Sequence, residues 1–418
     1  MTAALHLLRE TLPAFLQTRW RTRSALSREA FLRWQDAQIT EWLRRDLPRA
    51  PFYADRHPAT LADLPIIDKA DVMGDFAAFN TAGLSADAVW ERIDRNIEGR
   101  LIAGASTGTS GQRGLFLISR VESFRWLGVL LAKAIPDLLL RRHRIALILP
   151  RNARLYDAAS AAGPITLQFF PTDHDPAEWR AELERFAPSI VIATPHMLRL
   201  MAEAGHSIAP QRIFAAAETL DPQDRGLIEA HFGPLRQIYM ATEGLLAVSC
   251  AHGTLHLCED STHFELEEAE GGLVSPLITG FRRQVQIMAR YRMNDLLRMA
   301  APCPCGSPLR AVAEVVGRQD DIFRLGPSGA VRITPDTLRD AVLAASPAVT
   351  DFRVIQTGAA QVELRLPEAV EAGAKDAVEA ALRAVFSARG VSPEISRHTL
   401  DPRPKGGKLR RVMRRSGA

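Results

Sequence analysis

The stretch Gly104-Ala-Ser-Thr-Gly-Thr-Ser-Gly-Gln-Arg-Gly114 lies between two short apolar segments. Leu101-Ile102 precede it and Leu115-Phe-Leu-Ile118 follow it, which predicts two strands joined by a polar loop. Glycine leaves the backbone bare and reaches dihedrals that other residues avoid, so such a loop can turn N–H groups toward an anion, most often phosphate. A plain hairpin turn explains the segment equally well. The loop matches neither the Walker motif nor the dinucleotide-binding glycine pattern.

The whole chain has the composition of a globular protein that keeps its cysteines reduced. It has 418 residues, of which 47% are hydrophobic and 24% charged, enough for two or three domains. The net charge of +4 suits an anionic substrate. No apolar run is long enough for a signal peptide or a membrane span. Four cysteines do not make a disulfide scaffold, so we expect a cytoplasmic protein with no membrane partner.

Short apolar runs alternate with helical patterns in the middle of the chain, which argues for layers of α and β structure. The predicted buried strands are 145–149, 167–170, 190–193, 213–217 and 237–239. The predicted helices are 121–140 and 177–186, and a helical pattern also covers residues 1 to about 50. From about 245 to 325 we expect mostly strands. A smaller α+β unit follows, with elements at 335–345, 351–356, 361–366 and 374–389.

Three short motifs place polar residues near the ends of predicted strands. In Tyr239-Met-Ala-Thr-Glu243 a carboxylate next to a hydroxyl could hold a divalent metal, although Glu243 is as readily a surface acid. Tyr291-Arg-Met-Asn-Asp295 ends in an acid suited to ribose hydroxyls or to a simple turn. Gly317-Arg-Gln-Asp-Asp321 lies where the composition changes and is otherwise a charged linker.

The basic segment Pro402-Arg-Pro-Lys-Gly-Gly-Lys408 is not expected to be helical, because prolines and glycines interrupt it. A lysine there can reach a phosphate as a point charge. The alternative is a solvated or nucleic-acid-binding tail.

Cysteine and histidine also recur at a spacing that suits a metal. Cys250, His256, Cys303 and Cys305 offer the thiolate and imidazole ligands that tetrahedral zinc prefers. His252 and Cys258 are rival ligands, and unliganded thiols in a reduced protein are the alternative.

Six motifs together resemble, in order, those of the adenylate-forming superfamily of acyl-CoA synthetases, aryl-CoA ligases and nonribosomal adenylation domains. They are Ser106–Gly111, Ala217–Thr219, Tyr239–Glu243, Tyr291–Asp295, Gly317–Asp321 and Pro402–Lys408. The Pro-Phe-Tyr at 51–53, the Leu-Pro-Ile-Ile-Asp-Lys at 64–69 and the cysteine and histidine set are most similar to the phenylacetate-CoA ligase branch, and within it to uncharacterised adenylate-forming enzymes. That branch includes synthetases that adenylylate a deazaflavin coenzyme.

The resemblance implies an α/β fold with two parts. A large multi-layer α/β N-terminal domain, 1–318, would bind ATP and an acid. A small mobile α+β C-terminal lid, 322–418, would turn about a hinge near 319–321.

The resemblance also implies roles for individual residues. ATP would be held by Ser106, Thr107, Gly108, Thr109, Ser110 and Gly111 at the β- and γ-phosphates, by Ala217, Glu218, Thr219 and Tyr239 at adenine, and by Asp295 and Arg318 at the ribose. Thr242 and Glu243 would serve the α-phosphate and Mg²⁺, Asp320 would be the pivot, and Lys408 would reach the α-phosphate and the attacking carboxylate.

Three functions remain open at this stage. The first is adenylation of a small aryl or hydrophobic carboxylic acid, followed by transfer to CoA or to an acyl or peptidyl carrier protein. The segment 324–330 does not match the segment that shapes the family's thiol tunnel. This departure argues against the CoA step more than against the adenylation step. The second is an adenylyltransferase that leaves AMP on its product. The third is a non-catalytic protein whose basic tail binds an anion or RNA, although nucleic acid is not the expected partner; a homodimer is compatible with all three.

Overall fold

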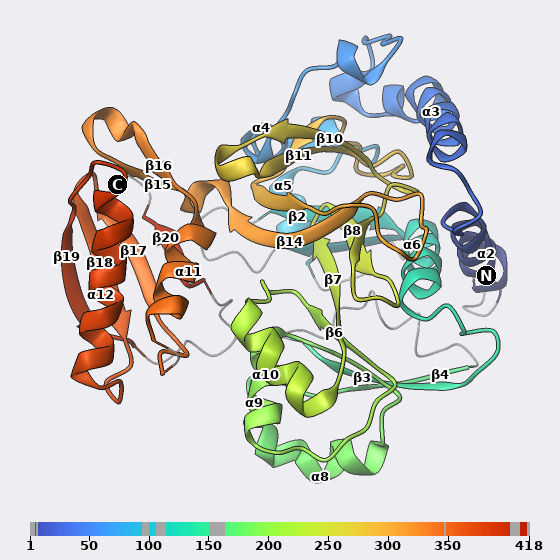
Figure 1. Cartoon of the computed structure of the whole chain (residues 1–418). Helices are drawn as coiled ribbons and strands as arrows, with labels where there is room; N and C mark the ends of the chain where they lie inside the picture. The colour runs from blue at the N-terminus through green and yellow to red at the C-terminus, as the bar shows by residue number, and fades with distance from the viewer. Residues whose placement is uncertain are drawn as a thin grey trace.

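The computed structural model describes residues 5, 7–93, 100–105, 114–149, 164–346, 348–401 and 410–415, which form a mixed α/β structure (Figure 1). Its α-helices are α2 (Leu12–Arg21), α3 (Arg28–Arg45), α4 (Lys69–Gly74), α5 (Ala86–Trp90), α6 (Arg120–Ala134), α8 (Pro176–Phe186), α9 (Pro195–Glu203), α10 (Pro222–Phe232), α11 (Pro335–Ala345) and α12 (Ala372–Ser387).

The strands are β1 (Leu101–Ala105), β2 (Leu115–Ser119), β3 (His143–Ile148), β4 (Ile165–Phe169), β5 (Ile190–Ala193), β6 (Arg212–Ala216), β7 (Leu235–Ala241), β8 (Gly244–Ser249), β9 (Leu255–Leu257), β10 (His263–Glu268), β11 (Val274–Thr279), β12 (Tyr291–Arg292), β13 (Asp295–Met299), β14 (Ala311–Arg318), β15 (Phe323–Leu325), β16 (Val331–Ile333), β17 (Arg353–Gly358), β18 (Gln361–Leu366), β19 (Glu394–Thr399) and β20 (Val412–Arg414).

A sheet of twelve strands within the described residues forms the centre of the molecule. Its order is β10-β11-β13-β14-β9-β8-β7-β6-β5-β3-β4, with β12 beside β11. The five strands from β4 to β7 are parallel, and every pairing from β7 to β10 is antiparallel. The sheet therefore changes its strand direction between β7 and β8, near the middle of its width.

Helices cover both faces of the parallel strands, and the alternation of side chains along β3 shows why. Ile145 and Leu147 belong to the core shared with α6 and α2, whereas Ala146 and Ile148 belong to the core shared with α8, α9 and α10. A strand buried on both faces must be apolar at every position, which is the continuous pattern that the sequence shows. Burial of each large aliphatic side chain contributes about 1.5–3 kcal/mol.

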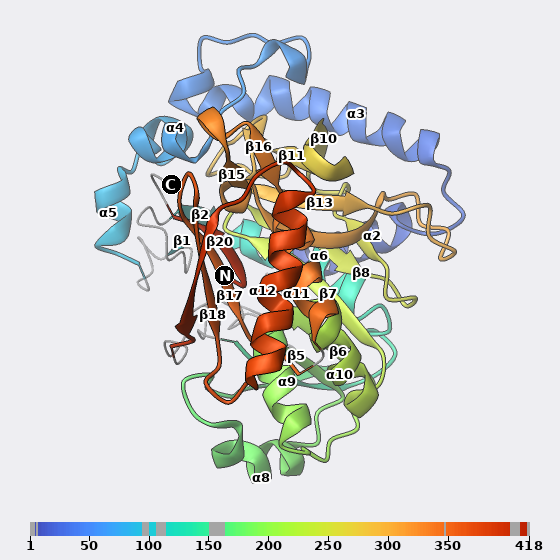
Figure 2. The same ribbon diagram turned by 60° about the vertical axis from the view of Figure 1, so that its left-hand side comes forward.

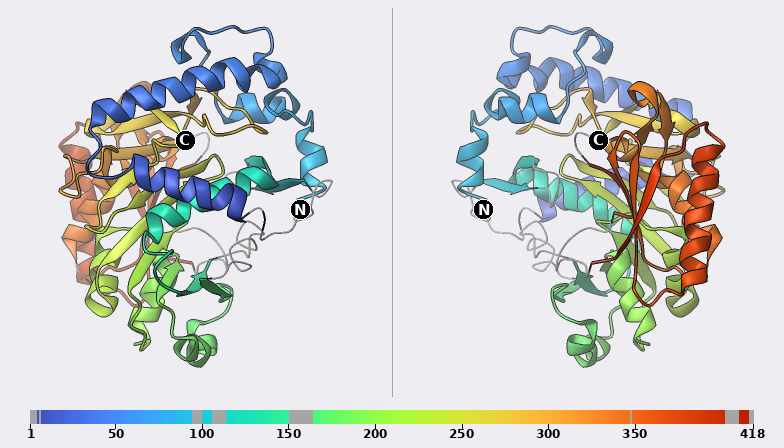
Figure 3. Two further views of the ribbon diagram at one scale, coloured as in Figure 1. Left: turned by 90° about the vertical axis from the view of Figure 1, so that its right-hand side faces the viewer. Right: turned by 90° about the vertical axis from the view of Figure 1, so that its left-hand side faces the viewer.

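The predicted strands on either side of the Gly/Ser/Thr-rich stretch are confirmed. They are β1 and β2, which pair antiparallel from Leu101 opposite Ser119 to Ala105 opposite Leu115. The helices α3 to α5 and the turns between them pack beside this hairpin in one core with strands of the antiparallel half of the sheet. In Figure 3 the blue helices α2 and α3 lie on the outside of this part.

The segment from residue 323 has a core of its own. The sheet β19-β18-β17-β20 packs with α11 and α12 around Phe352, Leu364 and Phe386. This orange-to-red unit stands at one end of the molecule, with α12 on its outer side (Figures 1 and 2). We refer to it as the C-terminal unit. Among the described helices, none is both long and apolar enough to cross a membrane.

The predicted helix 121–140 is confirmed up to residue 134 and is wrong in its last six residues. The helix α6 ends at Ala134, and Ile135 leaves the helical conformation with φ −130° and ψ 65°. Pro136 follows, and a residue before proline is pushed out of the α region by the proline ring. The apolar pattern continues beyond this point because Leu138 packs in the same core as α6.

Close packing of α6 against the N-terminal segment depends on Gly128, and a pair of substitutions tests it. A Cβ at this position would lie 2.4 Å from the carbonyl oxygen of Thr11 and 2.9 Å from Cβ of Ala14. We predict that Gly128→Ala lowers the free energy of unfolding by about 1–3 kcal/mol. Gly226→Ala, at an exposed position of α10 with nothing near its Cβ, should instead raise it by about 0.5–1 kcal/mol. Urea denaturation measures both; equal effects would contradict the packing argument.

Candidate functional site

Two cavities meet where the sheet changes direction. The first, cavity A, has a volume of about 860 Å³ and lies at the carboxyl ends of β6 and β7, beside the β13–β14 pair. The second, cavity B, has a volume of about 800 Å³ and lies between the central sheet, α2, α3 and α6. The residues that line both are Ala217, Glu218, Met240, Ala241, Thr242 and Glu243. Ligands of α/β sheets bind at such carboxyl ends, where strand order or direction changes.

The shared wall is a tight turn that presents Thr242 and Glu243. Ala241 pairs with Gly244, so only these two residues connect β7 to β8. Gly244 takes a φ of +150°, which glycine tolerates better than any other residue. The hydroxyl of Thr242 donates to Oε2 of Glu243 at 2.9 Å. Both side chains are therefore fixed at the boundary between the two cavities.

Tyr291 reaches the same carboxylate from β12. Burial raises the pKa of its hydroxyl, and the charge of Glu243, to which the hydroxyl donates, raises the pKa further. Tyr291 therefore stays a neutral donor that orients Glu243. The motif that contains it was selected for Asp295, so this contact was missed by the sequence analysis.

Tyr239, Asp295 and Arg318 form a second polar group in cavity A. The hydroxyl of Tyr239 donates to the carboxylate of Asp295. Asp295 lies directly opposite Arg318 in the register of β13 and β14. Burial raises the pKa of Tyr239 well above its usual value, and the negative charge of Asp295 adds to the shift. The tyrosine remains protonated and fixes the carboxylate at the floor of the cavity.

The chain turns sharply after β6 to bring Glu218 and Thr219 into cavity A. Ala217 has a φ of 68°, in the left-handed region that residues other than glycine seldom adopt. Such a conformation costs on the order of 1 kcal/mol and is concentrated at functional sites. The sequence gives no sign of it, because alanine is not a typical residue for a left-handed turn.

Residues 319–321, which lead into the C-terminal unit, contact the N-terminal part at this cavity. Asn294 donates to Asp320 at 2.5 Å, and the backbone N–H of Gln319 donates to the carbonyl of Asn294 at 2.8 Å. Arg410 pairs with Asp321, and burial raises the pKa of Asp321 while Arg410 opposes that shift.

Arg411 is buried between two acids of the N-terminal part. It pairs with Asp221 at the start of α10 and with Asp224 inside it. The residues Arg410 to Val412 also line cavity A. The segment that follows Lys408 in the sequence therefore closes one side of the cavity.

Two groups of predicted site residues lie outside the described residues. They are the loop Ser106–Gly111 and Lys408. The structure brings together the others that the resemblance assigns to nucleotide binding, because Ala217, Glu218, Thr219, Tyr239, Thr242, Glu243, Asp295 and Arg318 all line cavity A.

Lys69 is a further lining residue that the sequence analysis did not single out. It is the first residue of α4 and lines cavity A. Burial lowers its pKa, and the charge of Glu243 opposes that shift. Its side chain adds a positive charge near Glu243. The only signal was its place at the end of the segment 64–69.

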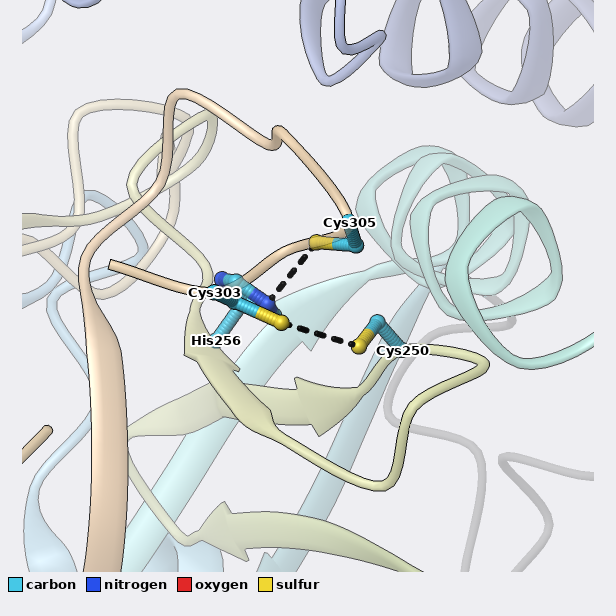
Figure 4. A group of neighbouring side chains, drawn as sticks. All are labelled: Cys250, His256, Cys303 and Cys305. Atoms are coloured by element: carbon cyan, nitrogen blue, oxygen red, sulfur yellow. Dashed lines mark hydrogen bonds between the residues drawn. The ribbon is translucent and has the colours of Figure 1, made fainter. Parts of the chain in front are cut away.

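The predicted metal ligands form a separate cluster (Figure 4). Cys250 follows β8, His256 lies on β9, and Cys303 and Cys305 lie in the loop between β13 and β14. Their four ligand atoms lie within 4.8 Å of one another. Sγ of Cys250 is 3.7 Å from Sγ of Cys303, and Sγ of Cys305 is 3.3 Å from Nε2 of His256. A tetrahedral zinc site with bonds of about 2.3 Å has edges of roughly 3.8 Å, so the spacing fits.

The surroundings of the cluster also suit a metal. Nδ1 of His256 lies 3.1 Å from the carbonyl oxygen of Leu309, which fixes the ring with Nε2 toward the thiols. Burial alone would raise the pKa of Cys303, but hydrogen bonds with Thr254, Cys305 and His256 lower it to about 6. A thiolate is the form that binds zinc.

The two rival ligands are not in the cluster. Cys258 is fully buried in the core beside α6, and burial raises its pKa to about 12. His252 is exposed and contacts Cys250 through its backbone N–H. The candidate zinc-ligand set among the described residues therefore consists of three cysteines and one histidine.

We predict that purified protein contains about one equivalent of zinc by elemental analysis. Cys303→Ser should lower this content, because it removes one of four ligands. Cys258→Ala should keep it, because that thiol lies in the apolar core. A metal-free protein of unchanged stability would show that the four residues are ordinary thiols and an imidazole.

Comparison with known proteins identifies the fold of this chain. No family model matches the sequence. Protein CapK of Staphylococcus aureus is 26% identical over 129 residues, which is 30% of this chain and 29% of CapK. The match thus spans less than a third of that relative.

Similarity to solved structures extends over most of the chain. The structure of 2-hydroxyisobutyryl-CoA ligase in the postadenylation state, in complex with 2-HIB-AMP, has 16% identity and a TM-score of 0.70, covering 95% of this chain and 91% of that one. O-succinylbenzoate coenzyme A synthetase (MenE) of Bacillus subtilis, in complex with AMP, has 15% identity and a TM-score of 0.52 over 74% and 68%. The chain therefore has the mixed α/β fold of adenylate-forming enzymes, and the predicted fold class is confirmed.

The same ligase offers a comparison between two states. In complex with 2-HIB-AMP and CoA in the thioesterification state, it has a TM-score of 0.54 with this chain, covering 91% of this chain and 89% of that one. The arrangement of the present structure is thus more similar to the postadenylation state.

Proposed function

We propose that this protein is an ATP-dependent ligase that adenylates a carboxylic acid and passes the acyl group to a thiol. The observation that carries the proposal is the Thr242-Glu243 turn shared by two cavities. A reaction that joins an acid to the α-phosphate of ATP needs two adjoining pockets with a common boundary at the reacting atoms. The fold similarity supports the same reaction class.

Cavity A is the proposed nucleotide site. Ala217, Glu218 and Thr219 would lie against adenine, with the ring of Tyr239 beside them. Asp295 and Arg318, opposite each other on β13 and β14, would bind the ribose hydroxyls. The loop Ser106–Gly111 follows β1 and is proposed for the β- and γ-phosphates.

The proposed chemistry occurs at the shared boundary. One oxygen of the acid attacks the α-phosphorus, the bond to the β-phosphate oxygen breaks, and pyrophosphate leaves with the electron pair. Both reactants are anionic, so positive charge must offset their repulsion in the transition state. Glu243 with Thr242 would hold Mg²⁺, which supplies such charge when bound. Lys408, two residues before Arg410, is proposed to supply a second positive charge.

A second half-reaction would follow after a movement of the C-terminal unit. We propose that residues 322–418 turn as a lid about 319–321, with Asp320 as the pivot, and that a thiol of CoA or of a carrier protein then attacks the acyl adenylate. The TM-scores against the two ligase states support an arrangement nearer to the postadenylation state than to the thioesterification state.

The finer assignment to the phenylacetate-CoA ligase branch also belongs to this proposal. Its support is local: Ile67 bridges to Tyr291 beside the site, and the Cys/His cluster ties the β8–β9 hairpin to the β13–β14 loop. Zinc would be structural there, because all four of its positions would be filled by protein ligands. Zinc binding requires cysteines that are not in disulfides, which agrees with a reducing, cytoplasmic location.

Acid-dependent exchange of radiolabelled pyrophosphate into ATP tests the adenylation step. A broad panel of acids should contain at least one that supports exchange. Product analysis then separates the outcomes: a thioester with free AMP indicates a ligase, and a stable adenylylated compound indicates an adenylyltransferase. Absence of exchange with every acid would favour a non-catalytic anion-binding protein.

Glu243→Gln should weaken the use of Mg²⁺. Even outer-shell partners of a metal change affinity by about 10–100-fold, so loss of a direct ligand should raise the Mg²⁺ requirement for exchange by at least about tenfold. Titration of Mg²⁺ in the exchange assay measures this. Glu268→Gln, on the exposed edge strand β10, is the matched control and should change nothing. Equal Mg²⁺ curves for both variants would reject Glu243 as the ligand.

Lys408→Ala should suppress adenylate formation by about a hundredfold, the cost of removing one positioned donor to a developing charge. Thioester formation from a supplied acyl adenylate should be spared, because that step does not involve attack on phosphorus. Single-turnover assays of the two half-reactions distinguish them. Equal loss in both would contradict the assigned role.

A further inference from the structure

Cavity B contains an arginine that forms no ion pair with a carboxylate among the described residues. Arg283, in the segment between β11 and β12, lines this cavity. Its Nε is buried and has no hydrogen-bond partner among the described residues. Its Nη2 lies 3.4 Å from Oε1 of Gln286, a long and weak contact. A buried guanidinium without a carboxylate is costly in free energy, so its retention requires an explanation.

The backbone around Arg283 is fixed on both sides. Nε1 of Trp42 donates to the carbonyl of Arg283 at 2.9 Å. The next two N–H groups, of Gln284 and Val285, donate to Oε1 of Glu122 at 2.8 and 3.3 Å. The carboxylate of Glu122 is thus engaged with the backbone of the segment. The backbone that carries the Arg283 side chain is thus held in place before any ligand binds, which lowers the entropic cost of binding.

A glycine makes room for the side chain. A Cβ at position 280 would lie 2.9 Å from Cγ of Arg283, closer than side chains normally approach. Gly280 therefore lets the Arg283 side chain pass beside the turn. Any larger residue there would displace it.

Three other arginines that line the cavity are already engaged. Arg125 pairs with Glu10 at 2.8 Å, and Arg45 pairs with Asp46 at 2.7 Å. Arg282 donates to the carbonyl of Asp260 and to the amide of Gln17. Burial lowers the pKa of Arg283, while Glu122 and Glu243 act against that shift. The guanidinium thus faces the cavity as a fixed cation with unused hydrogen-bonding capacity.

On the basis of the proposed function, we propose that the acid bound in cavity B carries a second anionic group, and that Arg283 binds this group. The reacting carboxylate is a poor candidate for Arg283, because a guanidinium that engages both carboxylate oxygens would occupy the one that must attack phosphorus. A second carboxylate or phosphoryl group can stay paired throughout the reaction. An acid that lacks it would leave the buried cation without a partner and would bind less well.

Matched pairs of acids test the proposal by direct binding. The probes are benzoate with isophthalate, phenylacetate with homophthalate, and butyrate with glutarate, each titrated calorimetrically into the full-length protein. At least one dianionic acid should bind about tenfold or more tightly than its partner, as expected for a hydrogen bond to a charged group. Arg283→Gln should abolish that ratio. If no dianionic acid binds more tightly than its partner, the proposal is wrong.

Control variants separate the proposal from loss of folding. Arg33→Gln, an exposed position on the same helix as Trp42, removes an equal charge and should keep the ratio. Gly280→Ala should lower the ratio, because it displaces Arg283 without removing it. Arg283→Lys should restore part of it. Equal loss of affinity for both acids of a pair in Arg283→Gln would show that Arg283 binds the reacting carboxylate or supports the fold, and would overturn the proposal.

The binding of a dianionic acid by Arg283 and the adenylation of that acid are tested by separate measurements. If a dianionic acid binds through Arg283 but supports no pyrophosphate exchange, the proposed adenylation is wrong while the assignment of Arg283 stands. If exchange occurs with monoanionic acids at equal or higher kcat/KM than with their dianionic partners, the adenylation stands and the assignment of Arg283 falls.

Discussion

The reversal of strand direction between β7 and β8 is the constraint on which the site depends. Parallel strands place their carboxyl ends along one edge, and the antiparallel partner returns from that edge through a turn of two residues. The turn leaves Thr242 and Glu243 no freedom to move away from the boundary between the cavities. The antiparallel half then brings Asp295 and Arg318 to the same edge from far along the chain.

Acids and bases both surround this boundary. In cavity A the central acids each have a partner: Asp295 has Tyr239, Glu243 has Tyr291 and Thr242, and Asp321 has Arg410. Neutral tyrosine donors orient carboxylates without cancelling their charge, which keeps the acids able to bind a cation. In cavity B, Arg283 adds a positive charge that forms no ion pair among the described residues.

Much of the fold could be predicted from short-range patterns. The strands at 145–149 and 190–193 and the helix at 177–186 follow from apolar runs and helical spacing, and the structure contains them with shifts of a residue or two. The end of α6 was mispredicted because Leu138 is buried by tertiary packing although it lies beyond the helix. The motif residues of cavity A could be selected because hydroxyls, acids and glycines at strand ends are unusual in themselves. Arg283 carries no such local mark, and Lys69 and Tyr291 lie inside segments that were selected for other features.

The sequence by itself determined the alternation of strands and helices, the fold class and the chemical groups available to a site, because these depend on the order and spacing of residues. Only the tertiary structure decided which groups face one another. It placed His256 and Cys305, rather than His252 and Cys258, beside Cys250. It also left Nε of Arg283 without a hydrogen-bond partner among the described residues. The physical reason is that contact and burial are set by long-range strand pairing and packing, which no single segment of the chain encodes.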